Sequence, residues 1–267
     1  MSSSSAYTGN IPQHYEQQLG PVLFEPYAED LAARVPAGTN ALLELACGTG
    51  RVTRHLDRRL SPSARLVASD LNSDMLTLAR SIVFSPRVEW LTVDAGVLPF
   101  ADGSFDAVVC QFGVMFFTDK RQAFREACRV LRAGGTFLFN TWLGLGANPR
   151  AAIMSQVLCE TLGAQAPDLL CSGPYSFHDE AHIALLLEEA GFRDIRVATV
   201  SRTGHYADPA QLVAGFVEGS PLGAYLDRFG AAMRGRIRER LQDALVAQEP
   251  TYGNEVPMRA LVVEAKK

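Results

Sequence analysis

The sequence predicts an α/β fold in which a mostly parallel sheet is covered by helices on both faces. Between residues 41 and 142, short apolar segments typical of buried strands alternate with segments whose apolar residues recur at helical spacing. The first apolar segment leads into a glycine-rich turn, Gly48-Thr49-Gly50, and then into a helical pattern. Strands and helices that alternate at this spacing form βαβ units, which pair their strands in parallel.

Five strands and three helices are expected in this region. The strands lie at residues 41–45, 65–69, 88–93, 105–110 and 135–142, and the helices at 52–60, 75–83 and 120–131. Asn72, Ser73 and Asp74 are capping candidates for the second helix, because their side chains can accept hydrogen bonds from its first N–H groups. The pair Gly134-Gly135 ends the third helix.

The flanking segments carry a less regular pattern. Residues 12–35 predict a helical lead-in that is broken by prolines and ends in a helix at about 23–35. Beyond residue 142, we expect a helix at about 149–162, a helix at 179–190 stopped by Gly191, and a strand at 193–200. Residues 208–248 indicate two further helices, inserted before a last strand at 258–265.

Composition and charge limit the classes of function. The 267 residues are 48% hydrophobic and 20% charged, which suits one domain with a sizeable core over residues 1–267. The net charge of −4, without a dense run of Lys or Arg, disfavours nucleic acid as a partner. Five widely spaced cysteines form no CxxC pair, so no metal is expected. Reduced cysteines, together with the lack of an apolar leader peptide or membrane-spanning stretch, predict a cytoplasmic protein that does not bind membranes. We expect a monomer or a homodimer.

The glycine-rich turn is the strongest local signal for a ligand. Its glycines let the backbone approach a ligand closely, and the helix that follows offers free N–H groups. Asp70 ends the second strand, twenty residues after Gly50, where a carboxylate can accept hydrogen bonds from ribose hydroxyls. On these two features alone, a nicotinamide or flavin nucleotide would fit as well.

Further positions favour an adenosyl ligand without phosphates. Thr53 stands where the dinucleotide fingerprint requires its third small residue. Glu44, four residues before the first glycine, would repel a pyrophosphate and suits a ligand with an ammonium or sulfonium group. Asp94 ends the third strand, where it could accept from an adenine amino group. Arg51, on the first helical turn, is expected within reach of a carboxylate on the ligand.

Four stretches of the chain resemble the successive motifs of class I S-adenosylmethionine-dependent methyltransferases: LLELACGTGRVT, VASDLNSDML, VDAGVLPFADGSFDAVV and REACRVLRAGGTFLF. The likeness is to the ubiquinone/menaquinone-biosynthesis branch (methyltransferase type 11), with a cofactor-binding core at residues 36–143. The resemblance implies a Rossmann-like sheet of seven strands in the order 3-2-1-4-5-7-6, strand seven being antiparallel, with helices on both faces and a helical cap.

The resemblance also implies which residues contact the cofactor, S-adenosyl-L-methionine. Residues in and before the glycine-rich turn would surround its methionine part: Glu44, Ala46, Gly48 and Gly50, with Cys47 packed inside the turn. Residues after the next three strands would hold the rest: Asp70 at the ribose, Leu71 and Met75 near the adenine, Asp94 and the Ala95 backbone at the adenine edge, and Gln111 facing the transferred methyl.

The segment after the fourth strand bears on the methyl acceptor. Adenine-N6 and glutamine methyltransferases carry an Asn-Pro-Pro-Tyr-like run there, whereas this chain reads Gln-Phe-Gly-Val and then Met-Phe-Phe over residues 111–117. An apolar, aromatic mouth favours a small organic molecule, methylated on O, N or C. His14 and Tyr15 are the candidate catalytic residues, because the lead-in can fold over the methyl group. Residues 12–35, 144–177 and 208–250 are expected to form a cap that encloses the acceptor.

Two other functions remain open. An NAD(P)-dependent oxidoreductase is disfavoured by Thr53, by Glu44 and by the absence of a Tyr-x-x-x-Lys pair. A catalytically silent cofactor-binding module is the other alternative, because binding residues alone do not guarantee turnover.

Overall fold

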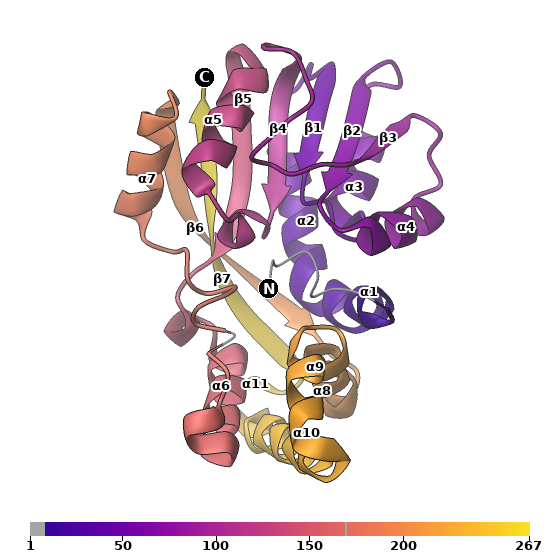
Figure 1. The fold of residues 1–267 in the computed structure, drawn as a ribbon, viewed down its shortest axis with the longest axis vertical. Helices are drawn as coiled ribbons and strands as arrows, with labels where there is room; N and C mark the ends of the chain where they lie inside the picture. The colour runs from indigo at the N-terminus through magenta and orange to yellow at the C-terminus, as the bar shows by residue number, and fades with distance from the viewer. Residues whose placement is uncertain (1–8, 169) are drawn as a thin grey trace.

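The computed structural model describes residues 9–168 and 170–267, which form one seven-stranded sheet with helices around it (Figure 1). The strand order is β3-β2-β1-β4-β5-β7-β6. The pairs among β1 to β5 are parallel, and β7 runs antiparallel to both β5 and β6. The predicted fold class and strand order are confirmed.

The strands follow the apolar segments of the sequence: β1 (Ala41–Leu45), β2 (Arg65–Asp70), β3 (Val88–Thr92), β4 (Phe105–Gln111), β5 (Leu131–Trp142), β6 (Arg193–His205) and β7 (Glu255–Lys266). β1 is buried at every position, because it lies between β2 and β4 under helices on both faces. β6 and β7 are longer than predicted at one end. They continue to pair with each other as far as His205 and Glu255, beyond the rest of the sheet.

The helices that cover the sheet are α3 (Arg51–Arg59), α4 (Ser73–Ile82), α5 (Lys120–Val130) and α7 (Glu180–Glu189). The side chain of Asn72 accepts the N–H groups of Asp74 and Met75, which confirms it as the N-cap of α4. Asp119 and Asp179 cap α5 and α7 in the same way. α5 and α7 lie on one face of the sheet, and α2 and α3 pack together on the other (Figure 1).

The lead-in is helical over more residues than predicted. It consists of α1 (Ile11–His14), the π-helix η2 (Tyr15–Phe24) and α2 (Glu25–Ala33). The sequence placed the final helix at about 23–35 and expected prolines to break the segment before it. Pro21 instead lies inside η2, whose wider turn tolerates the missing N–H group.

The remaining helices gather around the far ends of β6 and β7 (Figure 1). They are α6 (Pro149–Leu162), α8 (Pro209–Glu218), α9 (Leu222–Leu226), α10 (Gly230–Ala247) and α11 (Glu249–Tyr252). The prediction of two helices in residues 208–248 is wrong, since three α-helices occupy it. Pro221 precedes α9, and Gly230, whose φ is +81°, is the first residue of α10. These two residues divide the segment into three helices.

Candidate active site

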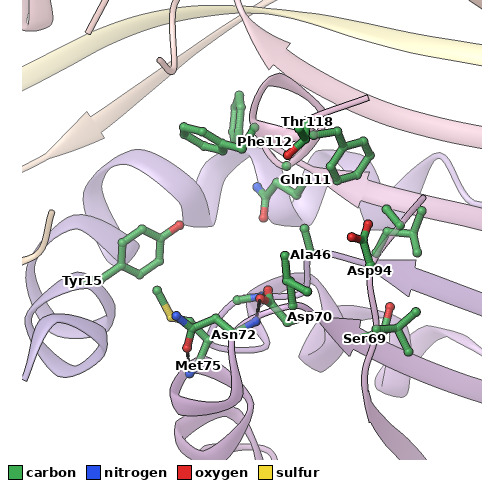
Figure 2. A pocket seen from close by; sticks show the side chains of 18 residues that line it. Tyr15, Ala46, Ser69, Asp70, Asn72, Met75, Asp94, Gln111, Phe112 and Thr118 are labelled. Atoms are coloured by element: carbon green, nitrogen blue, oxygen red, sulfur yellow. Dashed lines mark hydrogen bonds between the residues drawn. The ribbon is translucent and has the colours of Figure 1, made fainter. Parts of the chain in front are cut away.

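The carboxyl ends of β1 and β4 lie side by side at the point where the strand order reverses. In open α/β sheets this is where a crevice for a ligand forms. A pocket lies there, and Figure 2 shows side chains pointing into it from the strand ends and from the lead-in. Its lining includes Ala46 after β1, residues 69–72 and 93–95 around the ends of β2 and β3, and residues 111–113 and 116–118 after β4.

The backbone at this point takes left-handed angles. Ala46 has a φ of +51° and Phe112 one of +47°, while Gly48 and Gly50 have φ of +55° and +82°. Residues other than glycine seldom adopt such angles, and those that do concentrate at functional sites. A Cβ at Gly48 would meet no atom within 4 Å, so this glycine leaves open space beside the pocket that it lines.

Asp70 joins the glycine-rich turn to the end of β2. One carboxylate oxygen accepts the N–H of Gly48 and the other accepts the N–H of Asn72, each at 2.8 Å. Burial raises the pKa of Asp70, and these N–H groups oppose that effect. The backbone N–H of Leu71 is a third donor to this carboxylate, which has about four acceptor positions and so keeps capacity for a ligand hydroxyl. The residue predicted to hold the ribose therefore also fixes the turn.

Glu44 is buried beneath the turn, 1% exposed, and accepts a hydrogen bond of 2.6 Å from the hydroxyl of Thr53. Burial raises the pKa of Glu44 to about 8. Glu44 borders a second, smaller pocket, which shares Tyr15, Ala46, Gly48 and Gln111 with the first. From the sequence, Thr53 served only to disfavour a dinucleotide ligand. In the structure, the Thr53 hydroxyl orients the Glu44 side chain.

Arg51 also lines the second pocket, where the lead-in holds it. Its guanidinium pairs with Glu16 at 2.9 Å and with Glu25 at 2.5 Å, and it donates to the Glu16 carbonyl oxygen at 2.6 Å. Gly20 lies so close that any Cβ there would overlap the guanidinium. The Nε of Arg51 is buried and has no hydrogen-bond partner among the described residues. The predicted contact with a ligand carboxylate stays a prediction.

Most other predicted cofactor residues surround the same two pockets. Asp94, Ala95, Leu71 and Met75 line the first, and Cys47 lines the second. Leu71 is 45% exposed at the mouth, whereas Met75 is 6% exposed. Asp94 accepts the N–H of Gly96 at 2.8 Å.

Gly50 borders neither pocket. It instead packs beneath α4, where a Cβ would lie 2.9 Å from Cγ2 of Val83. Its left-handed φ of +82° turns the chain into α3.

Tyr15 and Gln111 line both pockets and therefore lie at their junction. The hydroxyl of Tyr15 points into the first pocket (Figure 2), and its ring stacks on Phe24 with centroids 4.8 Å apart. Gln111 ends β4, and its Nε2 donates to the Phe24 carbonyl oxygen at 2.8 Å. His14, the other candidate catalytic residue, lines neither pocket, and its buried Nδ1 has no partner among the described residues.

The aromatic mouth comes partly from residues that the sequence singled out. Phe112, Phe116 and Phe117 line the pocket, whereas Met115 is buried beneath them. Further lining residues were not assigned from the sequence: Ser69, Asn72, Val93, Gly113 and Thr118. Their proximity to strand ends was the signal that could have found them.

The described residues 9–168 and 170–267 contain neither a cluster of metal-ligating side chains nor a membrane-spanning helix. No group of three or more His, Cys, Asp and Glu side chains in this part of the chain could hold a metal ion. No helix within the same residues is long and apolar enough to cross a membrane.

Comparison with known proteins identifies the domain. A family described as "Methyltransferase domain" matches residues 43–139, which contain β1 to β4 and most of β5. The match includes the glycine-rich turn and the motifs that resemble class I S-adenosylmethionine-dependent methyltransferases. The ubiquinone/menaquinone biosynthesis C-methyltransferase UbiE of Hahella chejuensis is 41% identical over 108 residues. That match covers 39% of this chain and 43% of the relative, so the chain spans less than half the relative's length in the comparison.

Solved structures of proteins with different names share the fold over nearly the whole chain. Phosphoethanolamine N-methyltransferase 2 of Haemonchus contortus is similar with a TM-score of 0.63 and 20% identity, covering 98% of this chain and 58% of that one. The [4+2]-cyclase SpnF has a TM-score of 0.59 and 18% identity, covering 99% and 95% of the two chains. At such identities the likeness extends to the fold alone. The oxidoreductase alternative is not favoured by any of these findings.

Proposed function

We propose that the protein transfers a methyl group from S-adenosylmethionine to an O, N or C atom of a small organic molecule. One observation carries the choice of ligand. The charged residues that line the first pocket are two carboxylates, Asp70 and Asp94. Carboxylates repel the phosphates of a dinucleotide, but they accept hydrogen bonds from ribose hydroxyls and an adenine amino group.

The second pocket fits the methionine end of this cofactor. Glu44 would accept the ammonium group, and Arg51, which lines the same pocket, would attract the carboxylate. When bound, the cofactor supplies an electrophilic methyl group on a sulfonium. Tyr15 and Gln111 lie where the two pockets meet, so we place the methyl beside them.

The contribution of the chain to the reaction would be alignment and exclusion of water. Transfer requires acceptor, methyl and sulfur in line, which a closed wall around the acceptor imposes. Tyr15 and Phe112 provide such a wall, and the Tyr15 hydroxyl can orient the acceptor or take its proton. His14 remains the second candidate for this role, by a rearrangement of the lead-in.

The cap is proposed to set the identity of the acceptor. Residues 12–35, 144–177 and 208–250 lie outside the core at 36–143, and α8 packs directly on η2, which carries Tyr15. Exchanging residues 208–250 for those of a relative should therefore change acceptor preference. An unchanged preference would contradict a role of the cap in selection.

Incubation with methyl-labelled S-adenosylmethionine and a small-molecule extract, followed by mass spectrometry, tests the proposal. We expect a labelled small molecule and S-adenosylhomocysteine, both abolished by Asp70→Ala and reduced by Tyr15→Phe. Calorimetric titration with S-adenosylmethionine and NADH supplies the binding control. No binding of S-adenosylmethionine at millimolar concentration would refute the proposal, and binding without any labelled product would favour the silent module.

A further inference from the structure

The turn after β4 contains a residue in a conformation that its side chain disfavours. Phe112 has a φ of +47°, in the left-handed region that residues other than glycine seldom adopt. The next residue explains the turn, because a Cβ at Gly113 would lie 2.5 Å from the Ala46 Cβ and 2.7 Å from the Cys110 Sγ. The chain folds back tightly across the end of β1, and Phe112 takes the angle that permits it.

Asn140 of β5 clamps this turn. Its Oδ1 accepts the N–H of Phe112 at 2.8 Å, and its carbonyl oxygen accepts the same N–H at 3.3 Å. Because a backbone N–H can only donate, the side-chain oxygen must be the atom that faces it. Asn140 is fully buried and lines neither pocket. The side-chain hydrogen bond that links Asn140 to the pocket wall is the one from Phe112.

The Nδ2 atom of Asn140 indicates that this side chain does more than stabilise the fold. Its Nδ2 is buried without a hydrogen-bond partner among the residues that the structure describes. A buried donor without an acceptor destabilises a fold relative to an apolar side chain of similar size. The hydrogen bond from Phe112 is the interaction that a leucine at this position would lose.

Phe112 connects the clamp to the pocket. Its ring stacks on Trp142 with centroids 3.9 Å apart and planes inclined by 10°, and it meets Tyr27 edge-on at 5.3 Å. Phe112 also lines the pocket beside Gln111, whose side chain holds the Phe24 carbonyl of the lead-in. The left-handed turn at Phe112 thus follows directly on Gln111, and both residues line the pocket wall.

We propose that Asn140 is a positioning residue, which holds Phe112 in its left-handed conformation and thereby fixes the wall formed by Gln111 and Phe112. The placement of the transferred methyl beside this wall rests on the proposed function. The clamp itself is a property of the fold and is tested without turnover.

Trp142 reports the position of Phe112 directly. The chain has two tryptophans, so in a Trp90→Phe background the tryptophan fluorescence and the tryptophan bands of the near-ultraviolet circular dichroism come from Trp142. Asn140→Leu in this background should change both signals. It should also lower the affinity for S-adenosylhomocysteine about tenfold, as expected for the loss of one buried hydrogen bond to the pocket wall. Asn140→Asp, which keeps an acceptor oxygen, should restore both readouts.

Thr136→Val is the matched control. Thr136 lies four residues earlier in β5, is 2% exposed and accepts a single hydrogen bond of 2.7 Å from Lys266. The Thr136→Val variant should leave the Trp142 signals and the affinity for S-adenosylhomocysteine unchanged. A valine variant that reproduces the Asn140→Leu effects would overturn the proposal, as would unaltered Trp142 signals and affinity in Asn140→Leu. If Asn140→Leu fails to fold, Asn140→Ala takes its place.

A double variant gives an independent test. Phe112→Gly adopts the left-handed angle without help. Adding the Asn140 substitution to Phe112→Gly should therefore cost little further affinity, whereas a full additional loss would contradict the clamp. If wild-type protein does not bind S-adenosylhomocysteine, the proposed function fails, and the Trp142 signals still decide whether Asn140 holds Phe112.

Discussion

Glu44 and Thr53 form a buried hydrogen bond of 2.6 Å beneath the glycine-rich turn. The bond favours the charged carboxylate, but burial has the larger effect and raises the pKa of Glu44 from 4.5 to about 8. Asp70, a neighbouring acid, raises it further in the same direction. At neutral pH, burial therefore favours the protonated form of Glu44.

The first prediction concerns stability against pH. Unfolded Glu44 ionises near pH 4.5, whereas folded Glu44 keeps its proton up to about pH 8. The free energy of unfolding should therefore decrease as pH rises between these values, because only the unfolded state releases the proton there. Denaturant titrations across this range should show a steeper decrease for wild type than for Glu44→Gln. Parallel curves for the two proteins would contradict the raised pKa.

The second prediction couples cofactor binding to proton release. An ammonium group beside Glu44 would favour the carboxylate, so binding should release a proton below about pH 8. Apparent affinity should rise with pH in this range, by at most about tenfold per pH unit. Calorimetry in buffers of different ionisation enthalpy measures the released proton. Glu44→Gln should bind more weakly and release none, and equal proton release in both proteins would exclude Glu44 as the source.

Gly48 should be essential for binding S-adenosylmethionine, whereas Gly38, which has a similar backbone conformation, should not. Gly48→Val places a side chain in the space beside the pocket and also strains a φ of +55°. Gly38, with a φ of +80° and likewise no atom within 4 Å of a Cβ, carries the same backbone penalty away from either site pocket. Titration with S-adenosylmethionine should detect no binding for Gly48→Val and normal binding for Gly38→Val. Similar losses in both variants would assign the effect to strain.

The lead-in should loosen when Glu16 is removed. The Glu16 side chain is 12% exposed and accepts from the Thr49 hydroxyl at 2.5 Å as well as pairing with Arg51. Glu16→Ala should cost roughly 2–3 kcal/mol of unfolding free energy, because it leaves a buried guanidinium with fewer partners. Hydrogen exchange should accelerate in η2. The exposed pair Arg65–Glu89 is the comparison, and Glu89→Ala should cost at most about 1 kcal/mol.

Arg150 should be required for the cap to stay folded. It is 1% exposed and donates to the carbonyl oxygens of Leu245 at 3.1 Å, Gly253 at 2.8 Å and Glu255 at 3.0 Å. A lysine cannot reproduce this planar set of donors. Arg150→Lys should therefore cost roughly 2–4 kcal/mol. Thermal unfolding measures the loss, and Arg236→Lys on the exposed side of α10 should leave stability unchanged.

The fold and most of the proposed cofactor contacts were predictable because their signals are local. A buried strand, a glycine-rich turn and a capped helix are each written in consecutive residues, as the β1 segment and the Asn72 cap show. Since parallel strands end at one edge, the acids Asp70 and Asp94 had to meet there. The sequence by itself determined the fold class, the strand order implied by its motifs, and the edge at which a ligand would bind.

The tertiary structure decided which distant groups restrain that edge. Glu16 and Glu25 hold Arg51 from 35 and 26 residues away, and Asn140 holds Phe112 from 28 residues away. The hydrophobic pattern of the sequence does not predict such pairs, because they depend on how the lead-in and β5 pack against the strand ends. Burial also raises the pKa of Glu44 to about 8, so the carboxylate expected from the sequence favours its protonated form near neutral pH. That change follows from the dielectric surroundings of the folded chain, which residue type alone does not specify.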